Sequence, residues 1–101
     1  MPDTIVNDRK VFLLRSDAER KPLIQRLARI EGQVRGIRQM IEEDRHCGDE
    51  IQQIKAAMAA LRETGLAIVE QHVAAAAGVL DQDRSGAIAD IMTVLREAAR
   101  L

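Results

Sequence analysis

Aromatic residues are almost missing from this chain of 101 residues, which has one Phe and no Trp or Tyr. The core must therefore be built from aliphatic side chains. Only two prolines are present, and clusters of β-branched residues are few, which favours an all-helical protein. A single cysteine cannot form an intrachain disulfide, so we expect a cytoplasmic location.

Long apolar runs are also missing, and no stretch is long enough to span a bilayer. The N-terminal residues, with Asp3, Asn7 and Asp8, lack the apolar region of a signal peptide. The net charge of −1 does not by itself predict nucleic-acid binding, for which the distribution of charge matters more. A chain of this length is expected to be one domain with a modest core, so oligomerisation would help it.

Residues 47–79 are predicted to form one long helix, because they are rich in helix formers and contain no proline. Their apolar positions step by three and four, which is typical of a helix packed along a near-parallel neighbour. These positions are Ile51, Ile54, Met58, Leu61, Gly65, Ile68 and His72. One step of four back along this seam reaches Cys47. The only cysteine and one of the two histidines therefore share a stripe of the helix.

Cys47 and His72 lie about 37 Å apart along such a helix, at a rise of ~1.5 Å per residue. They cannot meet within one chain. They can meet if two copies pack antiparallel about a two-fold axis, which would cross the helix at Ala59–Ala60. The small residues there allow a close approach. We therefore predict a dimer with two identical sites, each combining Cys47 of one chain with His72 of the other.

Two further helices are predicted, over residues 20–43 and 86–100, with Pro22 in the first turn of one and Ser85 or Asp83 capping the other. Residues 1–19 are read as an N-terminal arm. Within that arm, the apolar run 11–14 is consistent with a strand or with one helical turn. The predicted fold is all-α, with a three-helix protomer whose two long helices form an antiparallel four-helix bundle with those of a second chain.

The first of these helices is basic around its apolar stripe, and two cations of the long helix extend the positive charge. A solvated surface is the usual meaning of such charges, but their single sign points to contacts with DNA phosphates, which give salt-dependent affinity. The predicted DNA-binding residues are Arg26, Arg29, Arg35, Arg38, Lys55 and Arg62.

The run from Arg26 to Ile37, Arg-Leu-Ala-Arg-Ile-Glu-Gly-Gln-Val-Arg-Gly-Ile, resembles the signature of the CsoR/RcnR/FrmR repressors. Cys47, the segment 51–56 and His72 match that family in type and spacing, and the resemblance covers residues 20–101. It implies a homotetramer, a dimer of dimers, that represses a promoter without a helix-turn-helix. It also implies that an inducer at the cysteine releases the operator DNA.

Two positions depart from the copper-sensing members of that family. Their second thiolate, one turn beyond the histidine, is replaced here by Ala76, which has no ligand atom. An arginine in the middle of their long helix aligns with Glu63. Asp90 lies near the place where copper members have a glutamate that supports the histidine.

A small electrophile such as formaldehyde is the leading predicted inducer, captured by the Cys47 thiolate. The resemblance to formaldehyde-responsive members of the family implies that an N-terminal amine, here at Pro2, takes part in the capture. A helix N-terminus favours the thiolate form of Cys47, and His72 is suited to act as its base. No resident cofactor is predicted with certainty.

The alternative inducer is a transition-metal ion, whether copper, nickel, cobalt or zinc, bound by Cys47 and His72. That site is incomplete unless the N-terminal amine, His46 or Asp90 supplies a third donor. An alternative of another class is a structural helical bundle that binds neither DNA nor an inducer. An enzyme is not expected, because no catalytic constellation has usable spacing.

Overall fold

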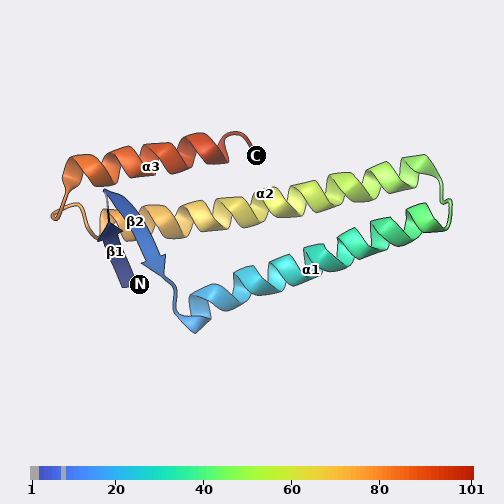
Figure 1. Ribbon diagram of the computed structural model, residues 1–101, viewed down its shortest axis with the longest axis horizontal. Coiled ribbons are helices and arrows are strands. Elements are labelled where there is room, and N and C mark those ends of the chain that lie inside the picture. Colours follow the sequence, from blue (N-terminus) through green and yellow to red (C-terminus); the bar gives the residue numbers. More distant parts are fainter. Residues whose placement is uncertain (1–2, 8) are drawn as a thin grey trace.

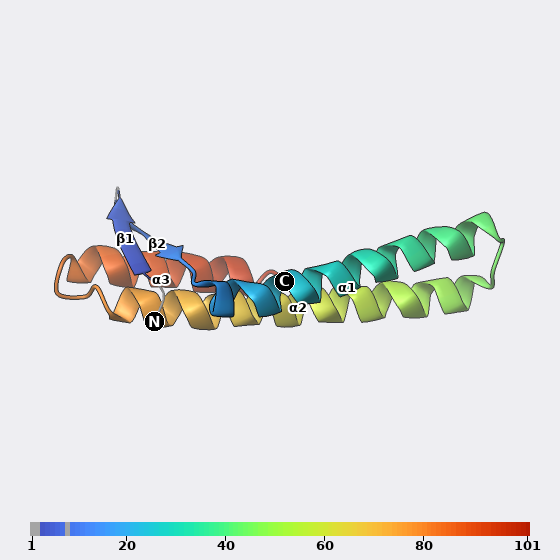
Figure 2. The ribbon, with the colours of Figure 1, turned by 90° about the horizontal axis from the view of Figure 1, so that it is seen from below.

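Three helices follow a pair of short strands in the computed structural model, which describes residues 3–7 and 9–101 (Figure 1). The elements are β1 (Asp3–Asn7), β2 (Lys10–Leu14), α1 (Asp17–Glu42), α2 (Cys47–Ala77) and α3 (Arg84–Ala98). α1 runs back along α2 as far as Gln71, whose Nε2 donates to Glu19 O at 3.3 Å, and α3 packs on the second half of α2 (Figures 1 and 2). The resulting protomer measures 57 × 27 × 18 Å. The predicted three helices and the start of the long helix at Cys47 are confirmed.

The all-α prediction was wrong for the N-terminal arm, where β1 and β2 pair as an antiparallel hairpin with Val6 opposite Val11. Val11 is buried and Leu13 half-buried, whereas Phe12 between them is 49% exposed. This alternation is the period-two pattern of a strand with one covered face. Four apolar residues in a row hide that period, because the exposed positions of β2 are as apolar as the buried ones.

α1 begins at a capping box that places its first residue three positions before the predicted start. The Ser16 side chain accepts a hydrogen bond from the Glu19 backbone N–H, and Glu19 Oε1 accepts one from the Ser16 N–H at 3.0 Å. The Ser16 hydroxyl also donates to Glu19 Oε1 at 2.7 Å, and this bond, together with the one from the Ser16 N–H, holds the pKa of the Glu19 carboxyl below its ordinary value. Pro22 is consequently the sixth helical residue, so its predicted place in the first turn was wrong.

The turn between α1 and α2 is a Schellman motif with an aspartate in the position that glycine usually takes. Arg45 N–H donates to Met40 O at 2.9 Å, and Asp44 N–H donates to Ile41 O at 3.2 Å. Asp44 has a φ of 52°, in the left-handed region. Aspartate tolerates this conformation better than most residues but not as well as glycine.

Asp83, one of the two caps predicted, is the N-cap of α3, which begins at Arg84 and not at the predicted residue 86. The Asp83 side chain accepts a hydrogen bond from the Gly86 N–H at 3.0 Å. The same carboxylate pairs with Arg9 of the strand hairpin, and this pairing lowers the pKa of Asp83 and raises that of Arg9. A side chain at position 86 would run into both partners, which explains a glycine there.

Buried apolar side chains gather where the strand hairpin meets the end of α2. Val11, Ala75, Ala76 and Val79 form this cluster, and Ile91 of α3 packs against it. Elsewhere the apolar seam of α2 is open: Ile51, Ile54, Met58, Leu61 and Ile68 are between 38% and 52% exposed. Within residues 3–7 and 9–101, no helix is long and apolar enough to cross a membrane.

Replacing Asp44→Gly should stabilise the protein by about 0.5–1 kcal/mol, because glycine adopts the left-handed conformation without strain. The matched control is Glu43→Gly, at a residue with φ −94°, where glycine should destabilise by a similar amount. Urea unfolding at a fixed protomer concentration measures both. Equal destabilisation by the two variants would contradict this account of the turn.

Candidate sensor site

His72 is held by a carboxylate of its own protomer. It lies on α2 and is 8% exposed, and its Nε2 is 3.0 Å from Oδ2 of Asp90 on α3. The same Oδ2 accepts a hydrogen bond from the backbone N–H of Val11 on β2, also at 3.0 Å. The side chains of His72 and Asp90 are only 11% and 12% exposed. Three elements thus meet at one carboxylate oxygen.

This arrangement determines which ring nitrogen of His72 remains for a ligand. A carboxylate accepts hydrogen bonds, so a neutral His72 carries its proton on Nε2 and has its lone pair on Nδ1. Histidines that bind metals are commonly oriented in this way, with the second nitrogen donating to a carboxylate. Asp90 therefore supports His72 and is itself occupied, which argues against Asp90 as the third ligand.

One turn further along α2, Ala76 and the Val11 side chain form a closed, apolar wall beside His72. Ala76 is fully buried, and Val11 covers it as part of the hydrophobic cluster. This is the position that holds a second thiolate in the copper sensors that the sequence resembles. Neither side chain has a donor atom, so this wall contributes no ligand.

Cys47 is the first residue of α2 and is exposed. The preceding His46 caps the helix by accepting a hydrogen bond on Nδ1 from the Gly48 N–H at 3.1 Å. A β-carbon at Gly48 would press on the His46 ring at 2.9 Å, so glycine permits this cap. Nδ1 of His46 is used by the cap and is not open to a ligand while the cap is in place.

The two predicted sensing residues lie at opposite ends of α2 in the protomer. No group of three or more His, Cys, Asp or Glu side chains is arranged to hold a metal ion in the part of the chain that the structure describes. Pro2, the predicted amine partner of Cys47, lies outside the described residues. The pairing of Cys47 with His72 between two chains stays a prediction.

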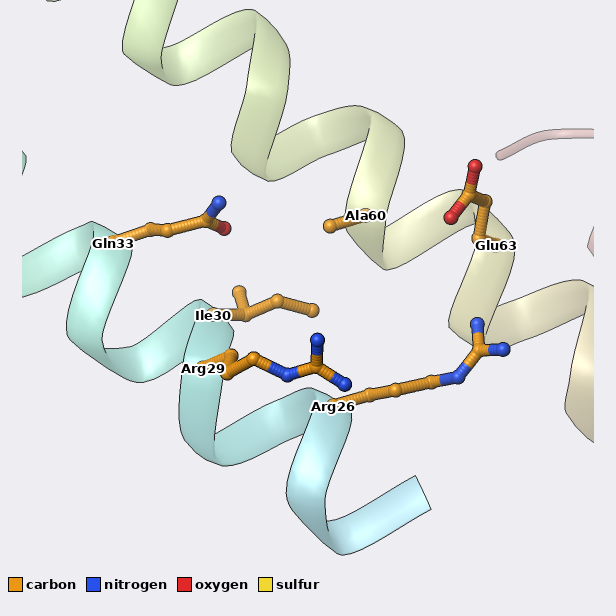
Figure 3. A pocket seen from close by; sticks show the side chains of 6 residues that line it. All are labelled: Arg26, Arg29, Ile30, Gln33, Ala60 and Glu63. Atoms are coloured by element: carbon orange, nitrogen blue, oxygen red, sulfur yellow. The ribbon is translucent and has the colours of Figure 1, made fainter. Parts of the chain in front are cut away.

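The predicted DNA-binding residues do not form a single face in one protomer. Arg26 and Arg29 line a pocket between α1 and α2, and Figure 3 shows Arg26 extending toward Glu63 across it. Arg35 is nine residues from Arg26, about two and a half turns, and therefore lies on the opposite side of α1. Acidic Glu63 thus reduces the positive charge of this pocket.

The other predicted DNA-binding cations differ in the ion pairs and hydrogen bonds that their side chains make. Arg38 Nε lies 3.5 Å from Glu42 Oε1, one helical turn away. Arg62 Nε donates to Leu101 O at 2.7 Å. Lys55 is exposed, like Arg29 and Arg35. Contact with DNA through these residues stays a prediction, and Arg29, Arg35 and Lys55 are the most accessible candidates.

Sequence reasoning missed the role of the strand hairpin at His72. Asp90 was noted as an equivalent of the supporting glutamate and as a candidate third metal donor, and nothing predicted its bond to Val11. Those two residues are 79 positions apart, and the contact uses a backbone N–H, which carries no side-chain signal. The apolar run 11–14 was the only local sign of a docked segment.

The family of the protein follows from a match over most of its length. The profile of metal-sensitive transcriptional repressors matches residues 19–97, which include all three helices nearly complete. The chain therefore belongs to that family of metal-sensitive transcriptional repressors. The resemblance predicted from the sequence is confirmed.

Among individual proteins, the chain is similar to two copper-sensing repressors. It is 37% identical over 93 residues to CsoR of Bacillus subtilis (strain 168), covering 90% of this chain and 92% of CsoR. It is 51% identical over 49 residues to RicR of Mycobacterium tuberculosis (strain ATCC 25618 / H37Rv), covering 48% of this chain and 51% of RicR.

Two solved structures share the fold. Copper-sensing CsoR with Cu(I) from Geobacillus thermodenitrificans NG80-2 superposes with a TM-score of 0.80 at 34% identity, covering 87% of this chain and 94% of that one. The nickel-responsive regulator InrS superposes with a TM-score of 0.71 at 26% identity, covering 77% and 90%. These relatives are named for copper and nickel, which favours the metal alternative over the predicted formaldehyde response.

Replacing Asp90→Ala should lower the free energy of unfolding by about 1–3 kcal/mol, because His72 Nε2 and the Val11 N–H both lose a nearly buried partner. The matched control is Asp81→Ala, at an exposed residue near the start of α3, where we expect less than about 0.5 kcal/mol. Urea unfolding at one protomer concentration compares them. Equal small effects would show that the carboxylate does not hold these elements together.

Proposed function

We propose that this protein is a homotetrameric repressor that binds operator DNA and releases it when a metal ion engages Cys47 of one protomer and His72 of another. The observation that carries the proposal is the His72–Asp90 pair at 3.0 Å, which leaves Nδ1 of a nearly buried histidine available. Family membership supplies the regulatory context. The exposed Cys47 thiol is the natural second donor.

Exposed apolar side chains support the assembly. The seam of α2 from Ile51 to Ile68 is open along the protomer, and a single-chain protein would leave it in water. A second α2 packed antiparallel would cover it and bring the two ends of the helices together. One symmetric contact therefore buries the seam and joins Cys47 to His72.

Cu(I) fits the available donors better than Ni(II). A thiolate and an imidazole are soft or intermediate ligands, whereas nickel sites commonly need more nitrogen and oxygen donors. Cu(I), when bound, would supply a positive charge that links Cys47 of one protomer to His72 of the next. Because the wall at Ala76 has no donor, a third ligand would come from another protomer or from solution.

The electrophile alternative rests on one observation, the exposed thiol at the start of α2. A thiolate there would add to a small aldehyde without any metal ligand set. The relatives named for copper and nickel make this the second candidate. The metal and electrophile candidates are distinguished by which compound, a metal ion or an aldehyde, releases the protein from operator DNA.

Operator release tests the function directly. The protein should bind its own promoter region about 1,000-fold more tightly than random DNA at physiological salt. One equivalent of Cu(I) per protomer should weaken operator binding by about 5–150-fold, the usual size of an allosteric coupling. Fluorescence anisotropy measures both, and parallel titrations with Ni(II), Zn(II) and formaldehyde rank the inducers.

Cys47→Ala is the control for operator release, because it should bind the operator as wild type does and ignore the inducer. Equal weak binding to operator and random DNA would instead favour a structural bundle with no regulatory role. Release by formaldehyde but by no metal would replace the metal proposal with the electrophile alternative.

Mixing two inactive variants tests whether the site lies between chains. Cys47→Ala and His72→Ala should each fail to bind Cu(I) tightly. A heterodimer of the two has one intact site, formed by Cys47 of one chain and His72 of the other, so the mixed protein should regain Cu(I) binding. Copies with two different tags allow the heterodimer to be purified. Equilibrium dialysis against a Cu(I) chelator should then give half the wild-type number of bound Cu(I) ions per protomer. No recovery would exclude a site shared between chains.

A further inference from the structure

An acidic residue of α2, Glu63, shares one pocket with Arg26 and Arg29 of α1 (Figure 3). The pocket has a volume of about 280 Å³ and is also lined by Ile30, Gln33 and Ala60. This volume holds several water molecules, at about 30 Å³ each, so it also admits a phosphate group. Arg26 is half-buried, whereas Arg29 and Glu63 are exposed. All three charges can therefore be reached from the surface.

The charged groups of this pocket are not used to hold the protomer together. None of the ion pairs within residues 3–7 and 9–101 includes Arg26, Arg29 or Glu63. Gln33 Oε1 is buried and has no hydrogen-bond partner in the same part of the chain, so it does not accept from either arginine. The two guanidinium groups and the carboxylate can thus act on a group that enters from outside.

A phosphate that approaches the two arginines also meets the carboxylate of Glu63. The guanidinium groups attract the phosphate, and the carboxylate repels it. The walls of the pocket keep part of the water away, which strengthens both effects relative to open solution. Two positive charges and one negative charge leave the pocket with half the net charge that the arginines alone would give.

We propose that Glu63 restrains sequence-independent DNA binding at Arg26 and Arg29 and thereby raises the preference of the protein for its operator. Attraction to phosphates is the same for every sequence and supplies nearly all of the affinity for random DNA. An operator adds contacts with base edges and with DNA shape, which one charge beside phosphate-binding residues weakens less. Repulsion at this pocket therefore costs random DNA more affinity than it costs the operator, which is one way in which proteins gain specificity.

This role of Glu63 rests on the proposed binding of DNA, but it depends neither on an inducer nor on the pairing of Cys47 with His72. Random DNA alone is enough to test the restraint. The promoter is needed only to test its effect on operator preference.

Replacing Glu63→Gln removes the charge and keeps the size of the side chain. The matched control is Glu70→Gln, which removes the same charge from the same side of α2, two turns and about 10 Å further along. Glu70 is also exposed, but it does not line the pocket. Because both are exposed surface residues, both variants should unfold in urea within about 0.5 kcal/mol of wild type.

Fluorescence anisotropy with a random duplex measures the restraint. Glu63→Gln should bind random DNA about tenfold more tightly than wild type, and the slope of log K against log salt should steepen by about one. Glu70→Gln should stay within about twofold of wild type, because salt screens a charge at that distance. In a protein that already carries Arg26→Ala and Arg29→Ala, the change at Glu63 should also gain less than about twofold.

A promoter duplex of the same length measures the effect on operator preference. Glu63→Gln should tighten promoter binding by about threefold or less, so the ratio of promoter affinity to random affinity should fall by at least about threefold. Glu70→Gln should keep the wild-type ratio.

Equal effects of Glu63→Gln and Glu70→Gln on random DNA would overturn the restraint, because net charge alone would then explain them. A tenfold gain that survives the loss of both arginines would also overturn it, because the carboxylate would act outside the pocket. Equal gains on promoter and random DNA would overturn the role in operator preference and leave the proposed function standing. If wild type binds both duplexes equally, the repressor function fails, and random DNA still decides whether Glu63 restrains binding.

Discussion

A rigid helix of 31 residues separates Cys47 from His72, and most of the biology proposed for this protein depends on that separation. At about 1.5 Å per residue the two groups are roughly 37 Å apart. No bending of a continuous helix brings them together, so chemistry that needs both must involve two chains. The same length exposes a long apolar seam, and covering that seam is the physical reason for two chains to pair.

Two carboxylates, that of Asp90 on α3 and that of its N-cap Asp83, connect segments of the protomer that are far apart in the sequence. Asp83 caps α3 and binds Arg9, while Asp90 accepts from His72 and from Val11. Each carboxylate joins the strand hairpin to a helix, and Asp90 also joins α3 to α2. The end of the molecule that contains His72 is therefore tied together by polar contacts between elements, and His72 is buried, whereas Cys47 at the other end is exposed. A site formed between chains would combine a buried half with an accessible half.

The closed wall at Ala76 explains how this member of the family differs from the copper sensors that it resembles. With the second thiolate absent and Val11 packed over the position, the protomer contributes fewer donors. The proposed site would therefore select ligands by softness and charge more than by a full coordination shell. The charge around the predicted DNA-binding residues differs as well, because Glu63 opposes Arg26 across the pocket of Figure 3.

Helices, caps and the position of Cys47 at the start of α2 could be predicted from sequence because neighbouring residues determine them. The long helix begins at Cys47 as expected, and the three-and-four spacing from Ile51 to Ile68 marks a seam that is indeed open in the protomer. The capping box at Ser16 was also readable, since its two side chains are three positions apart, although the predicted start at residue 20 overlooked it.

Only the tertiary structure decided what surrounds His72. Its partner Asp90 is 18 residues away and Val11 lies at the other end of the chain from Asp90, so no local period relates them. The run 11–14 became a strand because β1 pairs with it and α2 offers an apolar surface beneath it. Spacing along a chain determines which side chains share a helix face, whereas contacts between distant segments depend on how the whole chain packs.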